Sequence, residues 1–309
     1  MVNPTPNTAT VPLQVETQHQ DMIHDAQMDF YGKRLATCSS DRTIKIFDVL
    51  DPTAVEPKYT LLDTLRGHDG PVWQVSWAHP KFGSILASCS YDGKIFVWRE
   101  NVGNNNRTSS WEKIKEHTLH SASVNSIAWA PHEYGPILAC ASSDGKVSVL
   151  TFKDDGTWDA PLFTAHLIGC NAVSWQPYNP TSKEKILATG GSDSEVKLWK
   201  LNQLSQTWEL LEKLELSHND CIRDVAFSPC LIKTYLATAS HDKLVNVWSK
   251  DSNGWSKQSL DLTTFVGPIW SLSWSLSGNV LAVCSGDGKV SLWKENLKGL
   301  WECVSEMQQ

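Results

Sequence analysis

The chain has 309 residues, of which 41% are hydrophobic and 20% charged, and its formal net charge is -7. This composition is ordinary for a globular protein, and no Lys/Arg-rich run is present that would bind nucleic acid or an anionic membrane. No apolar run approaches the roughly 20 residues that a membrane-spanning helix requires. The N-terminal MVNPTPNTATVPLQ has neither a basic flank nor an apolar core, so we expect no secretory signal peptide.

The cysteines form no CxxC pair, so the sequence gives no support for a zinc or redox motif. Cys38, Cys89, Cys140 and Cys284 lie in similar apolar stretches, where free cysteine behaves as a small core residue. We expect a reduced protein that faces the cytosol, with no metal site and no cofactor.

Along the chain, one hairpin-like segment recurs as LATCSSDRTIKIF, LASCSYDGKIFVW, LACASSDGKVSVL, LATGGSDSEVKLW, LATASHDKLVNVW and LAVCSGDGKVSLW. Each copy reads as an apolar strand, a tight turn that contains Asp, and an alternating strand that ends in a large apolar residue. The turn aspartates are Asp41, Asp92, Asp144, Asp193, Asp242 and Asp287, which lie 51, 52, 49, 49 and 45 residues apart.

Another strand precedes each hairpin, as in PVWQVSWA and PIWSLSWS, and a more polar strand follows it. Four short strands per repeat, without helical periodicity, predict an all-β protein with the fold of a six-bladed β-propeller. We expect one propeller domain over residues 22–309, with blades at 22–65, 66–117, 118–165, 166–216, 217–264 and 265–309. Residues 1–21 form a polar tail or, through VPLQVET, begin an extra strand.

Three of the blades combine a histidine, a hydroxyl, an aspartate and a tryptophan at equivalent positions. These residues are His68, Ser88, Asp92 and Trp98 in blade two, His166, Thr189, Asp193 and Trp199 in blade four, and His218, Thr238, Asp242 and Trp248 in blade five. The same side chains build hydrolytic triads, but one hydrolase does not need three copies, and these hydroxyls stand inside strands rather than on a strained turn. The pattern resembles the structural tetrad of WD-repeat propellers, which pairs buried polar groups between strands.

The other three blades lack part of this tetrad. Blade one has Phe47 in place of Trp, and blade three has Cys140 and Leu150 at the hydroxyl and Trp positions. Blade six has Val283 at the hydroxyl position and no histidine before its first strand. We expect packing to hold these three blades more than the tetrad does.

The end of the chain decides how the ring closes. WD-repeat propellers usually exchange a strand between the first and last blades, but here GLWECVSE resembles the outer strands of the other blades. Trp301 follows Trp293 by 8 residues, as Trp158 follows Leu150. Blade six therefore has its own outer strand, and we predict an open or weakly closed ring whose exposed apolar blade faces belong to a partner.

Longer stretches resemble one particular family. IHDAQMDFYGKRLATCSSDRTIKIF, GHDGPVWQVSWAHPKFGSILASCSYDGKIFVW and HSASVNSIAWAPHEYGPILACASSDGKVSV are similar to the Sec-thirteen family, the WD-repeat subunits of the COPII outer coat and of the nuclear pore Y-shaped scaffold. The resemblance covers the chain from about Met22 onward. It implies an architectural, non-catalytic protein: an open six-bladed propeller into which an α-solenoid partner inserts a seventh blade between blades six and one.

The resemblance also implies the partners and their places in the cell. They are the large rod-forming subunit of the COPII outer coat at the cytoplasmic face of the endoplasmic reticulum, a scaffold nucleoporin of the Y-complex at the nuclear envelope, and subunits of a nutrient-signalling complex at the vacuole. No direct contact with nucleic acid is implied, and membranes are reached through the partners.

The resemblance does not identify the side chains that bind the partner. We expect Ile23, Met28 and Phe30 of blade one, and Trp270, Trp274 and Leu292 of blade six, to contribute. Strand alternation places about half of any such set on the other face.

Two other functions remain open from the residues alone. A peptide-binding WD-repeat adaptor would use the mouth of the central channel, but the sequence shows no recognition arm. A propeller hydrolase would need acidic residues clustered at one mouth, whereas the turn aspartates occur once per blade.

Overall fold

Each Asp-containing turn joins two antiparallel strands in the computed structural model, which describes residues 15–50, 58–102, 109–260 and 265–308. The residue after each of the six aspartates has a positive φ, between 64° and 79°. Three of these residues are glycines, which adopt this conformation without strain, and the others are Arg42, Ser194 and Lys243. Tight turns of this kind match the twist of the strands that they connect.

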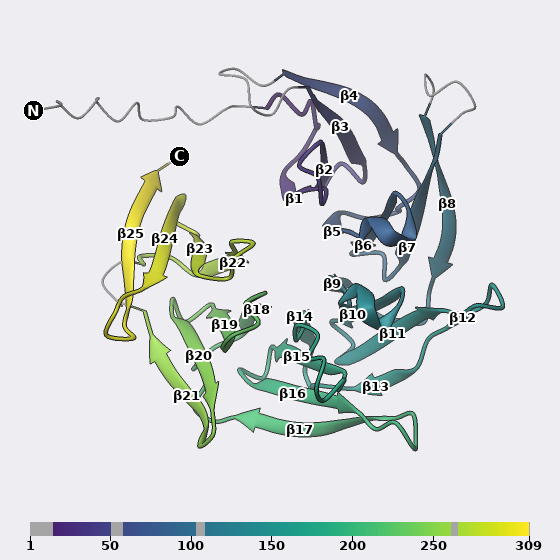
Figure 1. Ribbon diagram of the computed structural model, residues 1–309. Coiled ribbons are helices and arrows are strands. Elements are labelled where there is room, and N and C mark those ends of the chain that lie inside the picture. The colour runs from purple at the N-terminus through teal and green to yellow at the C-terminus, as the bar shows by residue number, and fades with distance from the viewer. Residues whose placement is uncertain (1–14, 51–57, 103–108, 261–264, 309) are drawn as a thin grey trace, which may run out of the picture.

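The strands form six antiparallel sheets, each of which is one blade, and this confirms the predicted six-bladed propeller (Figure 1). In every blade the strands follow one another from the central channel outward. Blade one contains β1 (Ile23–Met28), β2 (Arg34–Ser39), β3 (Ile44–Leu50) and β4 (Lys58–Leu65), and blade two contains β5 (Val72–Trp77), β6 (Ile85–Ser90), β7 (Ile95–Val102) and β8 (Ser109–His117).

The remaining blades repeat this order. Blade three contains β9 (Val124–Trp129), β10 (Ile137–Ser142), β11 (Lys146–Phe152), β12 (Trp158–Asp159) and β13 (Leu162–Thr164), and blade four contains β14 (Cys170–Trp175), β15 (Ile186–Gly191), β16 (Val196–Leu201) and β17 (Trp208–Leu214). Blade five contains β18 (Ile222–Phe227), β19 (Thr234–Ser240), β20 (Val245–Asp251) and β21 (Gly254–Ser259), and blade six contains β22 (Ile269–Trp274), β23 (Val280–Ser285), β24 (Lys289–Glu295) and β25 (Trp301–Gln308).

Blade three departs from the pattern at its outer edge, where two short strands, β12 and β13, both pair with β11. Pro161 stands between them. Proline has no backbone N–H to donate and is tolerated in a sheet only at an edge of this kind.

The last strand, β25, pairs with β24 along its whole length, from Glu295 opposite Trp301 to Lys289 opposite Gln308. Blade one likewise has its own outer strand, β4. The two blades therefore exchange no strand in the described part of the chain, as the sequence predicts.

The hydrophobic core is divided among the junctions between blades. Five clusters of buried side chains lie between blades one and two, two and three, three and four, four and five, and five and six. Within the described ranges, no such cluster joins blade six to blade one. Figure 1 shows these two blades separated, whereas every other pair of neighbours lies side by side.

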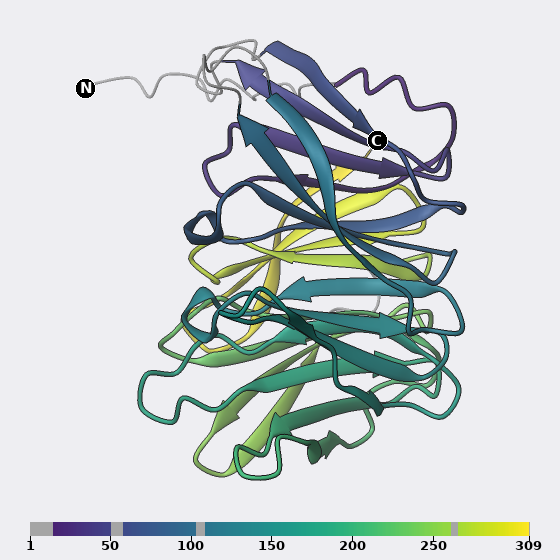
Figure 2. The same ribbon diagram turned by 90° about the vertical axis from the view of Figure 1, so that its right-hand side faces the viewer.

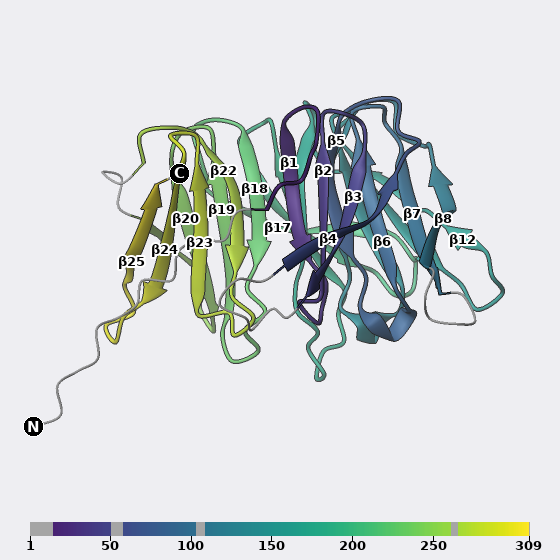
Figure 3. The ribbon, with the colours of Figure 1, turned by 90° about the horizontal axis from the view of Figure 1, so that it is seen from above.

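Two views at right angles show the same arrangement. The strands run across the thickness of the ring, and their turns lie on its two faces (Figure 2). In Figure 3, β17 and β18 from the far side of the ring are seen between β22 and β1. We call the region between blades six and one the open junction.

Two single turns of 3₁₀ helix, η1 (Pro80–Phe82) and η2 (His132–Tyr134), are the only helices among the described residues. They lie in the WAHPKFG and WAPHEYG stretches that carry the family resemblance. Neither of these two described helices is long enough to cross a membrane.

Candidate functional site

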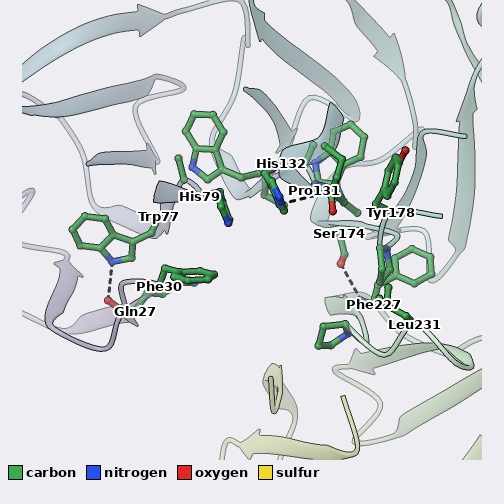
Figure 4. Close-up of a pocket in the computed structure, with 18 of the residues that line it drawn as sticks. Gln27, Phe30, Trp77, His79, Pro131, His132, Ser174, Tyr178, Phe227 and Leu231 are labelled. Carbon is green, nitrogen blue, oxygen red and sulfur yellow. Dashed lines mark hydrogen bonds and ion pairs between the residues drawn. The ribbon is translucent and has the colours of Figure 1, made fainter. Parts of the chain in front are cut away.

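Neighbouring blades are joined by a repeated pair of hydrogen bonds between their inner strands. We number the residues of each inner strand from one to six, so that Ile23 in β1 and Ile269 in β22 stand at position one. Between blades one and two, Trp77 Nε1 at position six donates to the carbonyl oxygen of Gln27 at position five, at 3.0 Å (Figure 4). The Val75 amide at position four donates to Asp25 Oδ2 at position three, at 3.2 Å.

The same pair recurs at three further junctions. The indole bonds are Trp129 to Ser76, Trp175 to Ala128 and Trp274 to Ala226, and the amide bonds are Ile127 to Gln74, Val173 to Ser126 and Leu272 to Asp224. Between blades four and five, Phe227 stands at position six and cannot donate an indole bond. There the Phe227 amide donates to Ser174 Oγ at 3.0 Å (Figure 4).

The open junction has no such bonds. Met28 stands at position six of β1 and has no N–H in its side chain. Ser271 and Ser273 stand at positions three and five of β22, and both are exposed. No hydrogen bond joins a strand of blade six to a strand of blade one among the residues that the structure describes.

Burial along the inner strands shows which surfaces are open. Positions one and four are buried in every inner strand from β5 to β22 because the preceding blade covers them. In β1 these positions are Ile23 and Ala26, and both are exposed. The strand that lines the open junction on blade one therefore lacks a preceding neighbour.

The flat face of blade six is also uncovered. In blade one, Ala36 and Cys38 of β2 and Ile44 and Ile46 of β3 are at most 1% exposed because blade two covers them. The register assigns Ala282, Cys284, Val290 and Leu292 to the same positions of blade six. Along β23, residues on this face are half-buried and alternate with buried ones, whereas β10 and β15 are buried throughout.

The other face of blade one, which lies toward the open junction, is partly covered by the chain that precedes β1. Lys45 Nζ donates to the carbonyl oxygens of Thr17 and Gln18, at 2.9 and 2.6 Å. His19 lies 2.8 Å from Asp41 Oδ2 and 2.9 Å from Thr37 Oγ1. A blade boundary at residue 22 thus leaves out a histidine that the structure places in blade one, while residues 1–14 lie outside the described part of the chain.

The tetrad of blade two forms one hydrogen-bonded chain. His68 Nδ1 lies 3.0 Å from Asp92 Oδ2, His68 Nε2 lies 2.9 Å from Ser88 Oγ, and Trp98 Nε1 donates to the same hydroxyl at 3.0 Å. Burial alone would raise the pKa of Asp92, but hydrogen bonds from His68 and the Asp69 amide outweigh it and lower that pKa to about 2. The Ser88 hydroxyl is fully buried, so a substrate cannot reach it.

Blades four and five contain the same chain of contacts. His166 bridges Asp193 and Thr189, and His218 bridges Asp242 and Thr238, while Trp199 and Trp248 donate to the threonine hydroxyls. Burial lowers the pKa of His166 in spite of the nearby Asp193 carboxylate. The arrangement holds the loop before each blade against its hairpin turn.

Blades one and three have more of the tetrad than the sequence indicated. Blade one uses His19. This histidine was not predicted because residues 1–21 were assigned to a tail or an extra strand. The spacing from His19 to Asp41, which is close to that of the other His–Asp pairs, could have revealed it. In blade three, His120 bridges Asp144 and Ser148, at 3.1 and 2.8 Å. Ser148 lies directly opposite Cys140 on the neighbouring strand, so the hydroxyl has moved across the hairpin. Blades one and three thus have the histidine, hydroxyl and aspartate of the tetrad but not its tryptophan, and the relative weight of packing and tetrad in them stays a prediction.

Blade six differs. Phe265 stands where the other blades have their histidine and packs against Trp293, with ring centroids 5.8 Å apart. Asp287 Oδ2 is buried and has no hydrogen-bond partner within the described chain. Blade six is therefore the blade that is least braced by polar contacts.

The six residues expected to bind the partner do not lie together. Ile23 and Met28 are 46% and 43% exposed at the two ends of β1, and Leu292 lies on the uncovered face of blade six. Phe30 and Trp270 lie at opposite mouths of the channel, beside His79 and Arg223. Trp274 points toward blade five, where its indole donates to Ala226.

The central channel holds two half-buried carboxyl groups that the sequence did not single out. Asp25 and Asp224 line a cavity of about 590 Å³ between the inner strands. Burial raises the pKa of Asp25 to about 6 and that of Asp224 to about 7. No group of three or more possible metal ligands occurs in the described ranges.

One mouth of the channel is an apolar pocket of about 700 Å³, lined by the ends of the inner strands and the loops that follow them (Figure 4). His79 and His132 stack at 3.9 Å, with their ring planes 11° apart, and Phe30 lies edge-on against His79. Pro131, Tyr178 and Leu231 complete the rim. This mouth is the place where an adaptor would hold a peptide.

Comparison with known proteins agrees with this geometry. Six matches to the WD domain, G-beta repeat family cover residues 10–48, 59–99, 111–151, 159–200, 208–249 and 260–294. Together with the tetrads and the open junction, they define the class as a WD-repeat β-propeller whose ring is not closed by its own strands.

Close relatives identify the family within this class. The chain is 51% identical to Protein transport protein SEC13 of Mycosarcoma maydis, over 97% of this chain and 96% of that protein. It is 51% identical to Protein transport protein SEC13 of Cryptococcus neoformans, over 96% and 98%, and 49% identical to Protein transport protein sec13 of Emericella nidulans, over 94% and 96%. The chain belongs to the SEC13 family.

Proposed function

We propose that this protein is a non-catalytic scaffold subunit in protein transport, completed by one blade from a partner. Its relatives are named as protein transport proteins. The observation that carries the proposal is the face of blade six, where Ala282, Cys284, Val290 and Leu292 are half-buried although their counterparts in blade one are sealed. An uncovered apolar blade face of this kind is suited to another blade.

The partner that fits is an α-solenoid subunit that carries a small β-blade. A blade has two apolar faces, and the open junction offers it two surfaces: the face of blade six with Leu292, and the strand of blade one with Ile23 and Met28. Adding β-structure to an incomplete β-fold is a common mode of protein recognition. Contact on both faces makes the interface large, as in permanent complexes.

Membership of the SEC13 family supports a proposal for the complexes in which this takes place. We propose the large rod-forming subunit of the COPII outer coat as the partner on vesicles that leave the endoplasmic reticulum for the Golgi. We propose a scaffold nucleoporin of the Y-complex as the partner at the nuclear envelope, and subunits of a nutrient-signalling complex at the vacuole. In each place the protein is peripheral to the membrane and is held there by its partner.

The residues that we assign to this contact are Ile23, Met28 and Leu292. Phe30 and Trp270 flank the junction at its two mouths, where they reach an inserted blade only at its ends. Trp274 supports the site from the side of blade five, since its indole bond and its contact with Trp301 hold β22 and β25 in place.

Replacing Leu292 with Glu tests this proposal. A carboxylate on the half-buried face would have to be desolvated against an incoming blade, so we expect at least a tenfold loss of affinity for the blade-bearing fragment of the rod-forming subunit, measured by calorimetry. Leu276→Glu is the matched control, because Leu276 is 99% exposed in the turn after β22. Equal binding by both variants, or no binding by the unchanged protein, contradicts the proposal.

A further inference from the structure

The hydrogen bonds between blades follow one pattern, and at the open junction only the acceptor side of that pattern is present. At four of the five closed junctions, the earlier blade offers two acceptors: a side chain at position three and the carbonyl oxygen at position five of its inner strand. The later blade supplies the two donors: its amide at position four and a tryptophan indole at position six. The pair fixes the register of one inner strand against the next.

Blade six has candidate acceptors at both of the matching positions of β22. The Ser271 hydroxyl stands at position three and lies near the Asp224 carboxyl group, which accepts the Leu272 amide at 2.7 Å. A hydroxyl that donates one bond still has lone pairs with which to accept another. The Ser273 carbonyl stands at position five, and the side chains of both serines are exposed.

Blade one cannot supply the donors. Met28 has no side-chain N–H at position six, and the Ala26 amide at position four donates instead to its neighbour Asp25, at 2.8 Å. The ring therefore cannot use its own first blade to satisfy Ser271 and Ser273. Among the described residues, blade one therefore offers no equivalent of the donor pair found at the other junctions, and a blade from another chain can supply it.

We propose that the partner's blade docks on β22 in the register of the other junctions, with a tryptophan at position six of its innermost strand. That indole donates to the Ser273 carbonyl oxygen, and the amide at position four donates to Ser271 Oγ. This inference rests on the proposed function, since it specifies the chemistry of the blade that the open junction receives.

The two sides of the inserted blade are then held differently. On blade six the contact has directional bonds and fixes the register of the incoming strand. On blade one, Ile23 and Met28 offer apolar contact without the indole bond. The partner is thus positioned by blade six and packed by blade one.

Variants of Ser271 test the register in the full-length protein. The probe is the blade-bearing fragment of the rod-forming subunit, and its affinity is measured by calorimetry. Ser271→Ala removes one hydrogen bond to the partner and is therefore expected to weaken binding about three- to tenfold. Ser271→Gln keeps an acceptor, as Gln74 does at this position in blade two, and is expected to restore binding.

Ser273→Ala is the matched control, because only the backbone carbonyl of Ser273 is used and that atom is unchanged. On the partner, replacing the position-six tryptophan of its innermost strand with phenylalanine is expected to cause a similar three- to tenfold loss. The melting temperature of each variant alone separates lost binding from lost folding.

The outcomes distinguish this inference from the proposed function. If the fragment does not bind the unchanged protein, the proposed function fails. If it binds but Ser271→Ala and Ser273→Ala are equivalent, or its innermost strand has no tryptophan at that position, the proposed function stands and the register is wrong. Loss with Ser271→Ala and recovery with Ser271→Gln support the register.

Discussion

The Ser88 hydroxyl shows how much one buried polar atom does in this protein. It accepts the indole N–H of Trp98 and contacts His68, which in turn holds Asp92. The Trp98 indole and the His68 imidazole are both buried between blades. A group that loses its partner in such a place bears the full cost of being removed from water.

Ser88→Ala is therefore expected to lower the free energy of unfolding by about 1–3 kcal/mol, measured by urea denaturation. Ser121→Ala, in an exposed loop of the next blade, is the control and should stay within about 0.5 kcal/mol of the unchanged protein. If both variants unfold at the same denaturant concentration, the tetrad does not stabilise blade two.

Asp224 gives the protein a pH dependence of the opposite sign to that of a salt-bridged carboxylate. Its pKa is about 7 in the folded protein because of burial, against roughly 4 in an unfolded chain. Between these pH values the folded state keeps a proton that the unfolded state releases. The stabilising contribution of this group is thus complete below about pH 4 and is lost as the pH rises through 7.

Asp224→Asn removes this titration and keeps an oxygen that can accept the Leu272 amide. We expect the variant to gain stability relative to the unchanged protein as the pH rises from 5 to 8, measured as the difference in free energy of unfolding. A difference that stays constant over this range would show that Asp224 does not hold its proton in the folded state.

At the scale of elements, Trp301 anchors β25 to the core in addition to the pairing of β25 with β24. Trp301 is 7% exposed and lies against Tyr235 and Trp274, with ring centroids 5.6 and 5.5 Å apart. The outer strand thereby connects to the core between blades five and six. Without this anchor β24 would be an uncovered sheet edge.

Trp301→Ala is expected to destabilise the protein by about 3–5 kcal/mol, seen as a lower midpoint of chemical denaturation. Leu297→Ala, in the exposed turn before β25, should have no measurable effect. A loss below about 1 kcal/mol for Trp301→Ala would mean that β25 contributes little to blade six.

The elements were predictable because each blade repeats one alternating pattern, and the spacing from Trp293 to Trp301 already assigns β25 to blade six. The spacing could not reveal that a residue on the adjacent strand of the hairpin supplies a missing tetrad hydroxyl. Ser148 replaces the hydroxyl that Cys140 lacks, because the two residues are paired on adjacent strands. His19 was hidden by polar neighbours that have no strand pattern of their own.

At the scale of the whole molecule, the sequence predicted an open ring but not which residues face the opening. A strand points its side chains alternately to both faces, and only the packing shows that Leu292 faces the opening while Trp274 faces blade five. The pairing of acceptors on β22 with donors on the next blade depends on contacts between chain segments some 50 residues apart, such as Trp77 and Gln27. No local pattern contains that information.

The open junction and the channel mouth allow a test that distinguishes a scaffold from a peptide-binding adaptor. His79→Ala combined with Tyr178→Ala alters the apolar channel mouth (Figure 4) and leaves the open junction intact. We expect this double variant to bind the rod-forming subunit within twofold of the unchanged protein in a pull-down titration. A loss comparable to that of Leu292→Glu would place the contact at the mouth instead.

If the proposed partner covers the half-buried face of blade six, the stability of this protein depends on the supply of that partner. A ligand that binds only the folded state adds RT ln(1 + [L]/Kd) to its stability, about 2.7 kcal/mol when the partner is present at a hundredfold excess over the dissociation constant. A change of 1–2 kcal/mol is enough to alter the steady-state level of a protein several-fold through quality control. We therefore expect copies made in excess of the proposed partner to lack this contribution and to be removed first, which would keep the two subunits in stoichiometric balance.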